Sequence, residues 1–144
     1  MSDHEILSVR TFAAPPDAVY GAFADPTRLA QWWGPAGFTN TVEAFELRAG
    51  GAFRIVMRGP DGAEYDNEKR FVAVQPGGLV VFDHLQPVHT FRMTMRFEPA
   101  GTGTKLTWHM RFTRPLAPDM RAFLAGANEQ NFDRLQAHLA AAAR

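Results

Sequence analysis

The stretch TFRMTMRFEPAGTGTKLTWHMRF, residues 90–112, decides the fold. Apolar and polar side chains alternate without a break over residues 90–97 and again over 105–112, and a glycine-containing segment separates the two runs. Alternation with a period of two is typical of strands that bury one face and expose the other. The stretch therefore predicts a β-hairpin in an antiparallel sheet with one apolar face and one solvated face.

Turn signals extend this pattern back toward residue 39. They fall at hairpin spacing and separate further apolar runs, such as FRIVMR at residues 53–58. The signals are Gly50-Gly51, Pro60-Asp61-Gly62, Pro76-Gly77-Gly78 and Gln86-Pro87. Together with a first strand around residues 6–12, they predict a sheet of about six to seven strands.

Helices flank this sheet in the sequence. Proline in the first turn predicts two short helices that begin at Pro15-Pro16 and at Asp25-Pro26. A third helix begins at Pro118-Asp119 and can run to about Ala142, roughly 35 Å at about 1.5 Å per residue. The predicted fold class is α+β, with one domain over residues 1–144. In this domain a curved antiparallel sheet wraps around the long C-terminal helix, and a cavity lies between them.

The composition narrows the classes of function. The chain has 144 residues, is 46% hydrophobic, has a formal net charge of +0 and contains no cysteine. A neutral chain lacks the basic surface that attracts nucleic acids or anionic membranes, and a chain without cysteine has no disulfide or thiolate chemistry. The N-terminal segment has no apolar run typical of a signal peptide, and no run is long enough to span a membrane. We expect a cytoplasmic protein with no nucleic-acid partner and no membrane insertion.

Two adjacent tryptophans, Trp32 and Trp33, lie at the end of the second predicted helix. Because neighbouring residues on a helix point about 100° apart, the two indoles cannot fill the same space. We expect one indole to pack under the first helix against Phe23 and the other to face the mouth of the cavity with Phe38; the sequence does not decide which. The turn at residues 34–37 then forms a hinge or a rim of the cavity.

The apolar face of the sheet and one stripe of the C-terminal helix supply the candidate ligand contacts. The predicted stripe comprises Met120, Leu124, Asn128, Asn131, Leu135 and Leu139. Its two asparagines either bind the polar end of a ligand or ordered water, or face solvent if the stripe is slightly rotated. Methionine suits irregular cavities because its side chain is flexible and polarizable. The predicted ligand-binding residues are Trp32, Trp33, Phe38, Phe53, Ile55, Met57, Tyr65, Asn67, Met93, Met95, Trp108, Met110, Leu124, Asn128 and Asn131.

The charged run AEYDNEKRF, residues 63–71, leaves two interpretations open. Tyr65, Asn67 and Lys69 share one face of the predicted strand. If this face lines the cavity, a buried lysine with a lowered pKa can act as a base. Otherwise the strand forms a lattice of cross-strand ion pairs on the solvated face, which the spacing of charges favours.

Two histidines, His84 and His89, flank the segment LQPV next to Asp83. A hairpin there would place the three side chains together as half of a metal site. No third histidine stands at a supporting spacing, so we expect solvent-facing histidines, no metal and no cofactor.

Three segments together resemble one known family: LAQWWGPAGFT at 29–39, the pair GG at 50–51 with RGPDG at 58–62, and FDRLQAHL at 132–139. The chain resembles the SRPBCC (START-like, Bet v-type) superfamily, within it the branch of heat-shock-protein-90 ATPase activator homologues, over about residues 8–140. The resemblance implies the helix-grip fold, whose members mostly bind apolar small molecules.

Two departures from this family bear on function. The eukaryotic co-chaperone has an additional N-terminal domain, for which this chain has no room. The branch often has a tryptophan where Asn128 stands, so we expect a larger and more polar cavity here.

These features predict binding of a small apolar or amphipathic ligand without catalysis. Two alternatives stay open. One is a cyclase- or dehydratase-like enzyme for a polyketide-like or aromatic substrate, which requires at least two of Tyr65, Lys69 and Asp83 in the cavity. The other is a module that assists a chaperone. A homodimer through a sheet edge or the solvated face is also left open.

Overall fold

The computed structural model describes residues 3–143 and shows one sheet and three helices within them. In chain order the elements are β1 (Glu5–Phe12), α1 (Pro16–Ala24), α2 (Pro26–Trp32), β2 (Thr39–Phe45), β3 (Ala52–Arg58), β4 (Glu64–Gln75), β5 (Leu79–Gln86), β6 (Phe91–Ala100), β7 (Gly103–Phe112) and α3 (Pro118–Ala142). The seven strands are antiparallel, in the order β1-β7-β6-β5-β4-β3-β2. The predicted α+β class and element order are confirmed.

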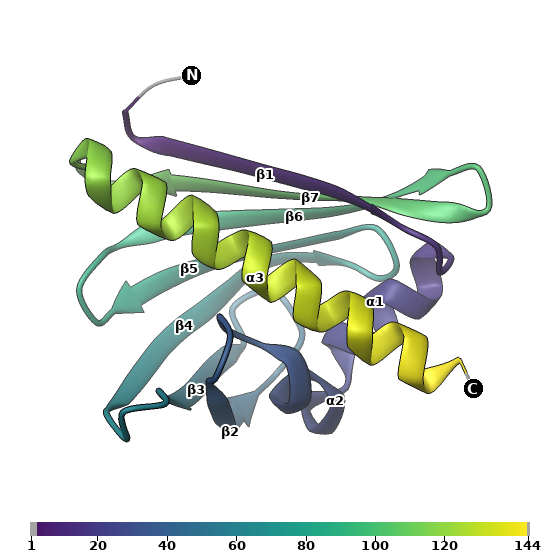
Figure 1. Cartoon of the computed structure of the whole chain (residues 1–144), viewed down its shortest axis with the longest axis horizontal. Coiled ribbons are helices and arrows are strands. Elements are labelled where there is room, and N and C mark those ends of the chain that lie inside the picture. The colour runs from purple at the N-terminus through teal and green to yellow at the C-terminus, as the bar shows by residue number, and fades with distance from the viewer. Residues whose placement is uncertain (1–2, 144) are drawn as a thin grey trace.

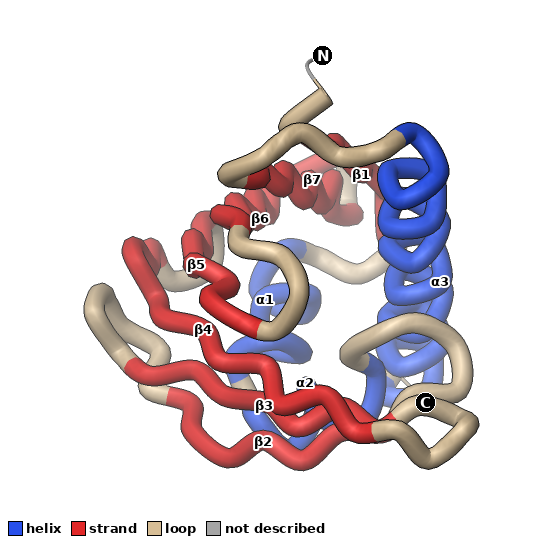
Figure 2. Tube along the Cα trace, turned by 90° about the vertical axis from the view of Figure 1, so that its left-hand side faces the viewer, coloured by secondary structure: helices blue, strands red, loops and turns tan. Residues whose placement is uncertain are grey.

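The sheet is strongly curved, and α3 lies across its concave face (Figure 1). Viewed along the strands, the sheet forms an arc that α3 closes on its open side, with α1 and α2 inside one end (Figure 2). This is the helix-grip arrangement, in which a straight helix and a curved sheet cannot touch along their whole length.

The hairpin of β6 and β7 packs as its alternation predicts. Met93 pairs with Met110, and Met95 with Trp108, and all four side chains are buried on the concave face. On the convex face, Arg92 bonds Asp83 of β5 with its Nε and Nη2 at 2.8 and 3.1 Å. The period-two pattern therefore separates the apolar core from a solvated lattice of charges.

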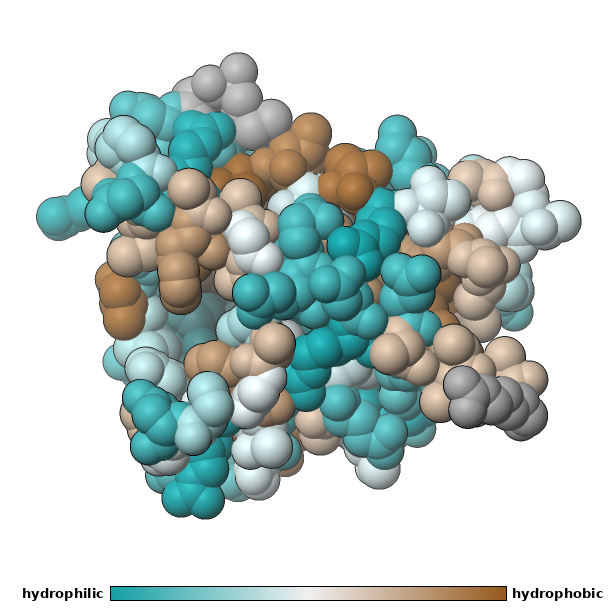
Figure 3. All heavy atoms as spheres, in the orientation of Figure 1, coloured by the Kyte–Doolittle hydropathy of each residue, from teal (hydrophilic) through white to brown (hydrophobic). Residues whose placement is uncertain are grey.

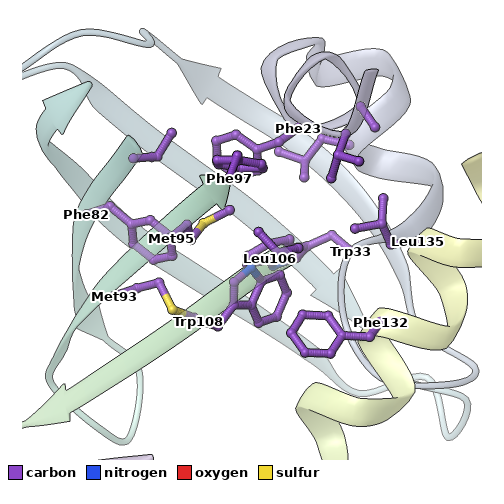
Figure 4. Close-up of a cluster of buried hydrophobic side chains, with 14 of the residues drawn as sticks. Phe23, Trp33, Phe82, Met93, Met95, Phe97, Leu106, Trp108, Phe132 and Leu135 are labelled. Atoms are coloured by element: carbon purple, nitrogen blue, oxygen red, sulfur yellow. The ribbon is translucent and has the colours of Figure 1, made fainter. Parts of the chain in front are cut away.

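The C-terminal half of α3 anchors the helix to the sheet. Phe132, which lies outside the predicted stripe, is fully buried, and its ring centroid lies 4.7 Å from that of Trp108 (Figure 4). Leu135 and Leu139 are buried beside it. In the N-terminal half, by contrast, Leu124 is only half-buried.

The two tryptophans, Trp32 and Trp33, make different contacts. Trp32 is almost fully buried and donates a hydrogen bond from Nε1 to the Ala22 carbonyl of α1 at 3.0 Å. The Trp33 indole is also buried, and its ring centroid lies 6.1 Å from that of Phe23 and 5.4 Å from that of Trp108. Trp32 therefore packs under α1 and Trp33 reaches the cavity, one indole at each place as predicted, but the predicted contact with Phe23 is wrong because Trp33 makes it.

The turn after α2 is held in place by α3. Asn131 accepts from the Gly34 amide at 3.1 Å and donates to the Trp32 carbonyl at 2.9 Å. Arg134 donates from Nη1 to the carbonyls of Trp33, Gly34 and Pro35 at 2.7 to 3.1 Å. Gly34 has φ of 92°, and a Cβ there would lie 2.7 Å from the Met57 methyl group. Of the two predicted roles, this clamped turn fits a rim rather than a hinge.

Candidate functional site

A cavity of about 220 Å³ lies between the curved sheet and the N-terminal half of α3. Strands β3 to β7, the turn after α2 and one side of α3 line it. In the space-filling view a recess opens below the N-terminal part of α3, on the left (Figure 3). The lining residues are Trp33, Gly34, Pro35, Met57, Asn67, Lys69, Phe82, His84, Pro87, His89, Phe91, Met93, Trp108, Met110, Leu124, Ala127, Asn128 and Asn131.

Unpartnered polar atoms gather in this cavity. Among residues 3–143, five buried side-chain nitrogen or oxygen atoms have no hydrogen-bond partner in the protein, and four of them belong to cavity-lining residues. These four are Lys69 Nζ, His84 Nδ1, His89 Nε2 and Trp108 Nε1. A buried polar group without a partner costs about 1–3 kcal/mol, so four at one place mark a site that a polar group can complete.

Lys69 is the most unusual of these residues. It is 5% exposed, and its Nζ lies 4.6, 5.8 and 6.0 Å from the ring centroids of Phe53, Trp33 and Phe82. No aspartate or glutamate is among the residues that line the cavity. Burial without a counter-ion lowers the pKa of Lys69 from 10.5 to about 7, because desolvation disfavours the charged amine.

His84 is the cross-strand neighbour of Lys69 and is also buried. Its Nε2 lies 3.2 Å from the Pro87 carbonyl oxygen, which can only accept, so Nε2 carries the proton and Nδ1 has a free lone pair. Burial, with a further contribution from Lys69, lowers the pKa of His84 to about 4. The imidazole is therefore a neutral acceptor at pH 7, and the prediction of a solvent-facing histidine here is wrong.

His89 borders two hollows of the surface. It lines the cavity and also an open cleft of about 590 Å³ between the loop after β5 and the segment that joins β7 to α3. Val88, 83% exposed, and Met120 line the cleft as well. His89 thus lies between this cleft and the cavity.

The structure divides the predicted ligand-binding residues into two groups. Nine line the cavity: Trp33, Met57, Asn67, Met93, Trp108, Met110, Leu124, Asn128 and Asn131. Six do not, and they are Trp32, Phe38, Phe53, Ile55, Tyr65 and Met95. Of these six, Phe53, Ile55 and Met95 are packed core. The Phe38 ring instead lies 6.2 Å from the ring of the exposed Tyr65.

The two asparagines of α3 are engaged within the protein. Both polar atoms of the buried Asn131 bond to the turn after α2. Asn128 is half-buried and donates from Nδ2 to Ser8 Oγ at 3.1 Å and to Met110 Sδ at 3.3 Å. The solvent-facing alternative is therefore wrong for Asn131, whose main role in the structure is to hold the rim.

The charged strand β4 has one solvated face and one face that is buried toward the cavity, so each interpretation of its sequence describes one face. Asp66 faces solvent and forms an ion pair with Arg54 at 2.6 Å, whereas Asn67 and Lys69 are buried toward the cavity. The favoured prediction of a wholly solvated lattice is wrong for these two residues. The enzyme alternative required at least two of Tyr65, Lys69 and Asp83 in the cavity. This requirement is not met, because Lys69 lines the cavity and Tyr65 and Asp83 do not.

The structure gives no indication of a metal centre or a membrane span in the part of the chain it describes. No group of three or more His, Cys, Asp or Glu side chains within residues 3–143 is placed to hold a metal ion. Over the same residues, no helix has both the length and the apolar character needed to cross a membrane.

Fold and cavity together define a helix-grip protein. The family model described as Activator of Hsp90 ATPase homolog 1-like protein matches residues 13–140. The chain therefore belongs to this family. No curated protein matches the sequence significantly.

Solved structures share the fold over almost the whole chain. A protein from Rhodobacter sphaeroides is 27% identical, with a TM-score of 0.85 over 97% of this chain and 94% of that one. Protein CV1439 from Chromobacterium violaceum is 25% identical, with a TM-score of 0.83 over 94% and 96% of the two chains. The AHSA1 protein from Silicibacter pomeroyi is 23% identical, with a TM-score of 0.78 over 94% and 97%. In these three comparisons the shared fold covers almost the whole of both chains.

Proposed function

We propose that this protein binds a small amphipathic molecule in the cavity between the sheet and α3. The observation that carries the proposal is the group of four unpartnered buried nitrogens in an otherwise largely apolar cavity. Ligand sites are typically apolar with a few polar groups that fix orientation. A tightly packed core would bond these groups or omit them.

The nitrogens favour a polar end that carries oxygen. Lys69 Nζ and Trp108 Nε1 are donors without acceptors, and His84 Nδ1 is an acceptor without a donor. A carbonyl, carboxyl or hydroxyl group fits such a set. The apolar part of the ligand then lies against Met57, Met93 and other apolar residues of the lining.

The volume favours a small ligand. Pockets for drug-sized ligands are about 300–1,000 Å³, and an engineered apolar cavity of about 150 Å³ in another protein holds benzene. A cavity of about 220 Å³ therefore suits a single-ring or short aliphatic molecule better than a sterol or a phospholipid.

A ligand panel tests the proposal with two readouts, melting temperature and intrinsic tryptophan fluorescence, because Trp33 and Trp108 line the cavity. The panel consists of benzoate, benzyl alcohol, phenylacetate, hexanoate and decanoate. We expect at least one of the short compounds to raise the melting temperature and to quench the fluorescence with the same dissociation constant.

Two matched variants on α3 test whether the ligand binds in this cavity. Ala127 lines the cavity and Ala137 is exposed on the same helix. Ala127→Leu fills the cavity and should abolish the shift, whereas Ala137→Leu should leave it unchanged. No response to any compound, or an equal response in both variants, contradicts the proposal.

The family offers a second candidate function, which is assistance to a chaperone ATPase. The observation that favours it is the family match over residues 13–140. Mixing the protein with a heat-shock-protein-90-type chaperone and measuring ATP hydrolysis tests this candidate. A rate that rises with the protein concentration supports it, and an unchanged rate contradicts it.

A further inference from the structure

We propose that Lys69 is a reactive amine that captures the carbonyl carbon of small hydrophobic aldehydes and ketones as an imine. The inference rests on the proposed function, since the carbonyl compound must first enter the cavity. It extends that function from reversible binding to a covalent step with a stated chemical class of substrate.

The geometry around Lys69 supports a desolvated nucleophile in the wall of the cavity. The amine has no hydrogen-bond partner in the protein, and the aromatic rings of Phe53, Trp33 and Phe82 surround it. Lys69 also lines the cavity, so a molecule bound there lies next to this side chain. A lysine that is desolvated in an apolar pocket is a recognised nucleophile toward carbonyl groups.

The charged and titratable groups near Lys69 are consistent with this role. The lining contains His84 from β5 and His89 from the loop that follows, and it contains no carboxylate that would hold the amine as ammonium. Burial lowers the pKa of Lys69 to about 7, so a substantial fraction of the amine is neutral near pH 7, and it lowers the pKa of His84 to about 4, so the imidazole is neutral there. An ion pair, by contrast, would have raised the pKa of the lysine and suppressed its reactivity.

The step balances without an oxidant or a metal. The lone pair of Nζ attacks the carbonyl carbon, a C–N bond forms, and the π electrons of the carbonyl move to its oxygen. One proton leaves Nζ and one reaches the oxygen, which gives a carbinolamine. Loss of water breaks the C–O bond and leaves the C=N bond of the imine, and hydrolysis reverses the sequence.

His84 is placed to assist the proton movement. It is the register partner of Lys69 on the neighbouring strand, and its Nδ1 has a free lone pair because Nε2–H donates to Pro87. Because Nζ and Nδ1 do not bond each other, the proton that leaves Nζ reaches Nδ1 through the carbinolamine oxygen or a water molecule, and Nδ1 returns it to the departing oxygen. The apolar walls of the cavity limit the water that would reverse the reaction.

The sequence provides an internal control for a test, because the chain has only two lysines, Lys69 and the exposed Lys105. The full chain is incubated at pH 7.5 with benzaldehyde and cyanoborohydride, which reduces an imine to a stable benzylamine. Peptide mapping by mass spectrometry then gives separate rates for Lys69, Lys105 and the N-terminal amine. We expect Lys69 to be alkylated about tenfold faster than Lys105, or more, and benzyl alcohol to suppress the reaction at Lys69 alone.

A further measurement tests the role of His84. At saturating benzaldehyde, His84→Gln should lower the rate of alkylation at Lys69 several-fold, and an unchanged rate overturns the role proposed for His84. Alkylation of Lys69 no faster than that of Lys105 overturns the imine proposal. If benzyl alcohol still quenches the tryptophan fluorescence in that case, the proposed function stands and only the covalent step fails. If no compound of the panel binds either, the proposed function fails with it.

Discussion

The two halves of α3 meet the sheet in different ways. In the C-terminal half, Phe132 and Leu135 are fully buried, and Asn131 and Arg134 bond the turn after α2. In the N-terminal half, Leu124 is half-buried, and the sheet opposite carries nitrogens without partners. The C-terminal half stabilises the fold by close packing, whereas the N-terminal half faces buried polar groups that have no partner in the protein and therefore reduce stability.

The largest difference should appear when each half loses one apolar side chain. Phe132→Ala removes a ring that packs on Trp108 and Phe12, and we expect it to lower the free energy of unfolding by about 3–5 kcal/mol. Leu124→Ala enlarges an existing cavity, so we expect it to lower the free energy of unfolding by only roughly 1 kcal/mol. Urea unfolding of both variants checks this, and equal losses would contradict the division of α3 into two halves.

The next effect concerns the buried amine opposite the N-terminal half of α3. Lys69→Met removes a group that must be desolvated on folding, so we expect the variant to be more stable at pH 7 by roughly 2–4 kcal/mol. The wild-type amine has its pKa lowered to about 7 in the folded chain, so the unfolded chain binds more protons between pH 7 and 10.5. Wild-type stability should therefore rise with pH across that window, with the full penalty present below pH 7.

Unfolding curves at several pH values measure how stability changes with pH in the wild type, Lys69→Met and Lys105→Met. Lys69→Met should show no rise between pH 7 and 10, and Lys105→Met, at the exposed lysine, should keep the wild-type rise. The pKa of His84, lowered to about 4, adds a further rise between pH 4 and 6.5 that all three share. A slope that persists in Lys69→Met would show that Lys69 is not its source.

A smaller loss of stability is expected from substitutions in the turn after α2, which forms the rim between the two halves of α3. Gly34 and Gly62 both have positive φ, at 92° and 86°, but only a Cβ at Gly34 meets a neighbour, the Met57 methyl at 2.7 Å. Gly62→Ala should cost about 1–2 kcal/mol for the backbone alone, and Gly34→Ala should cost more because Met57 must move. Thermal unfolding of the pair isolates the contact with Met57, and equal costs would argue against it.

The smallest effect belongs to the convex face of the sheet. Asp83 pairs with Arg92 in the solvated lattice, so Asp83→Asn should change the free energy of unfolding by less than about 1 kcal/mol. Binding of the ligand panel should be unaffected, because Asp83 does not line the cavity. A clear loss of binding in this variant, measured by tryptophan fluorescence, would restore the enzyme alternative that included Asp83.

Local pattern predicts the fold of this chain well and its site only in part. The alternation of residues 90–112 predicts which face of β6 and β7 is buried, since period two couples sequence directly to facing. The same rule groups Asn67 and Lys69 on one face of β4, but the charges on both faces hide which one is buried. A lysine on an apolar face is rare enough that composition alone argues against burial.

Contacts between distant segments are the part that the sequence does not reveal. Phe132 and Arg134 become important because α3 crosses the sheet at a particular angle and meets the turn at residues 33–35. The partner of each lies about 100 residues away or on another element, and no short-range pattern encodes it. His84 is buried for a related reason, since its exposure depends on the course of the loop that carries Pro87.

The central claim is that the cavity beside the N-terminal half of α3 contains an unpaired amine and binds a ligand. The most direct test of this claim is an NMR titration of Lys69. With ¹³C-labelled lysine the spectrum contains only two lysine side chains, and Lys69→Met assigns the signals. The account predicts that the Lys69 signal titrates with a midpoint of about 7 and that the signal shifts when benzoate is added. A Lys69 signal that titrates near the ordinary lysine value of about 10.4, and does not respond to any compound of the panel, would contradict it.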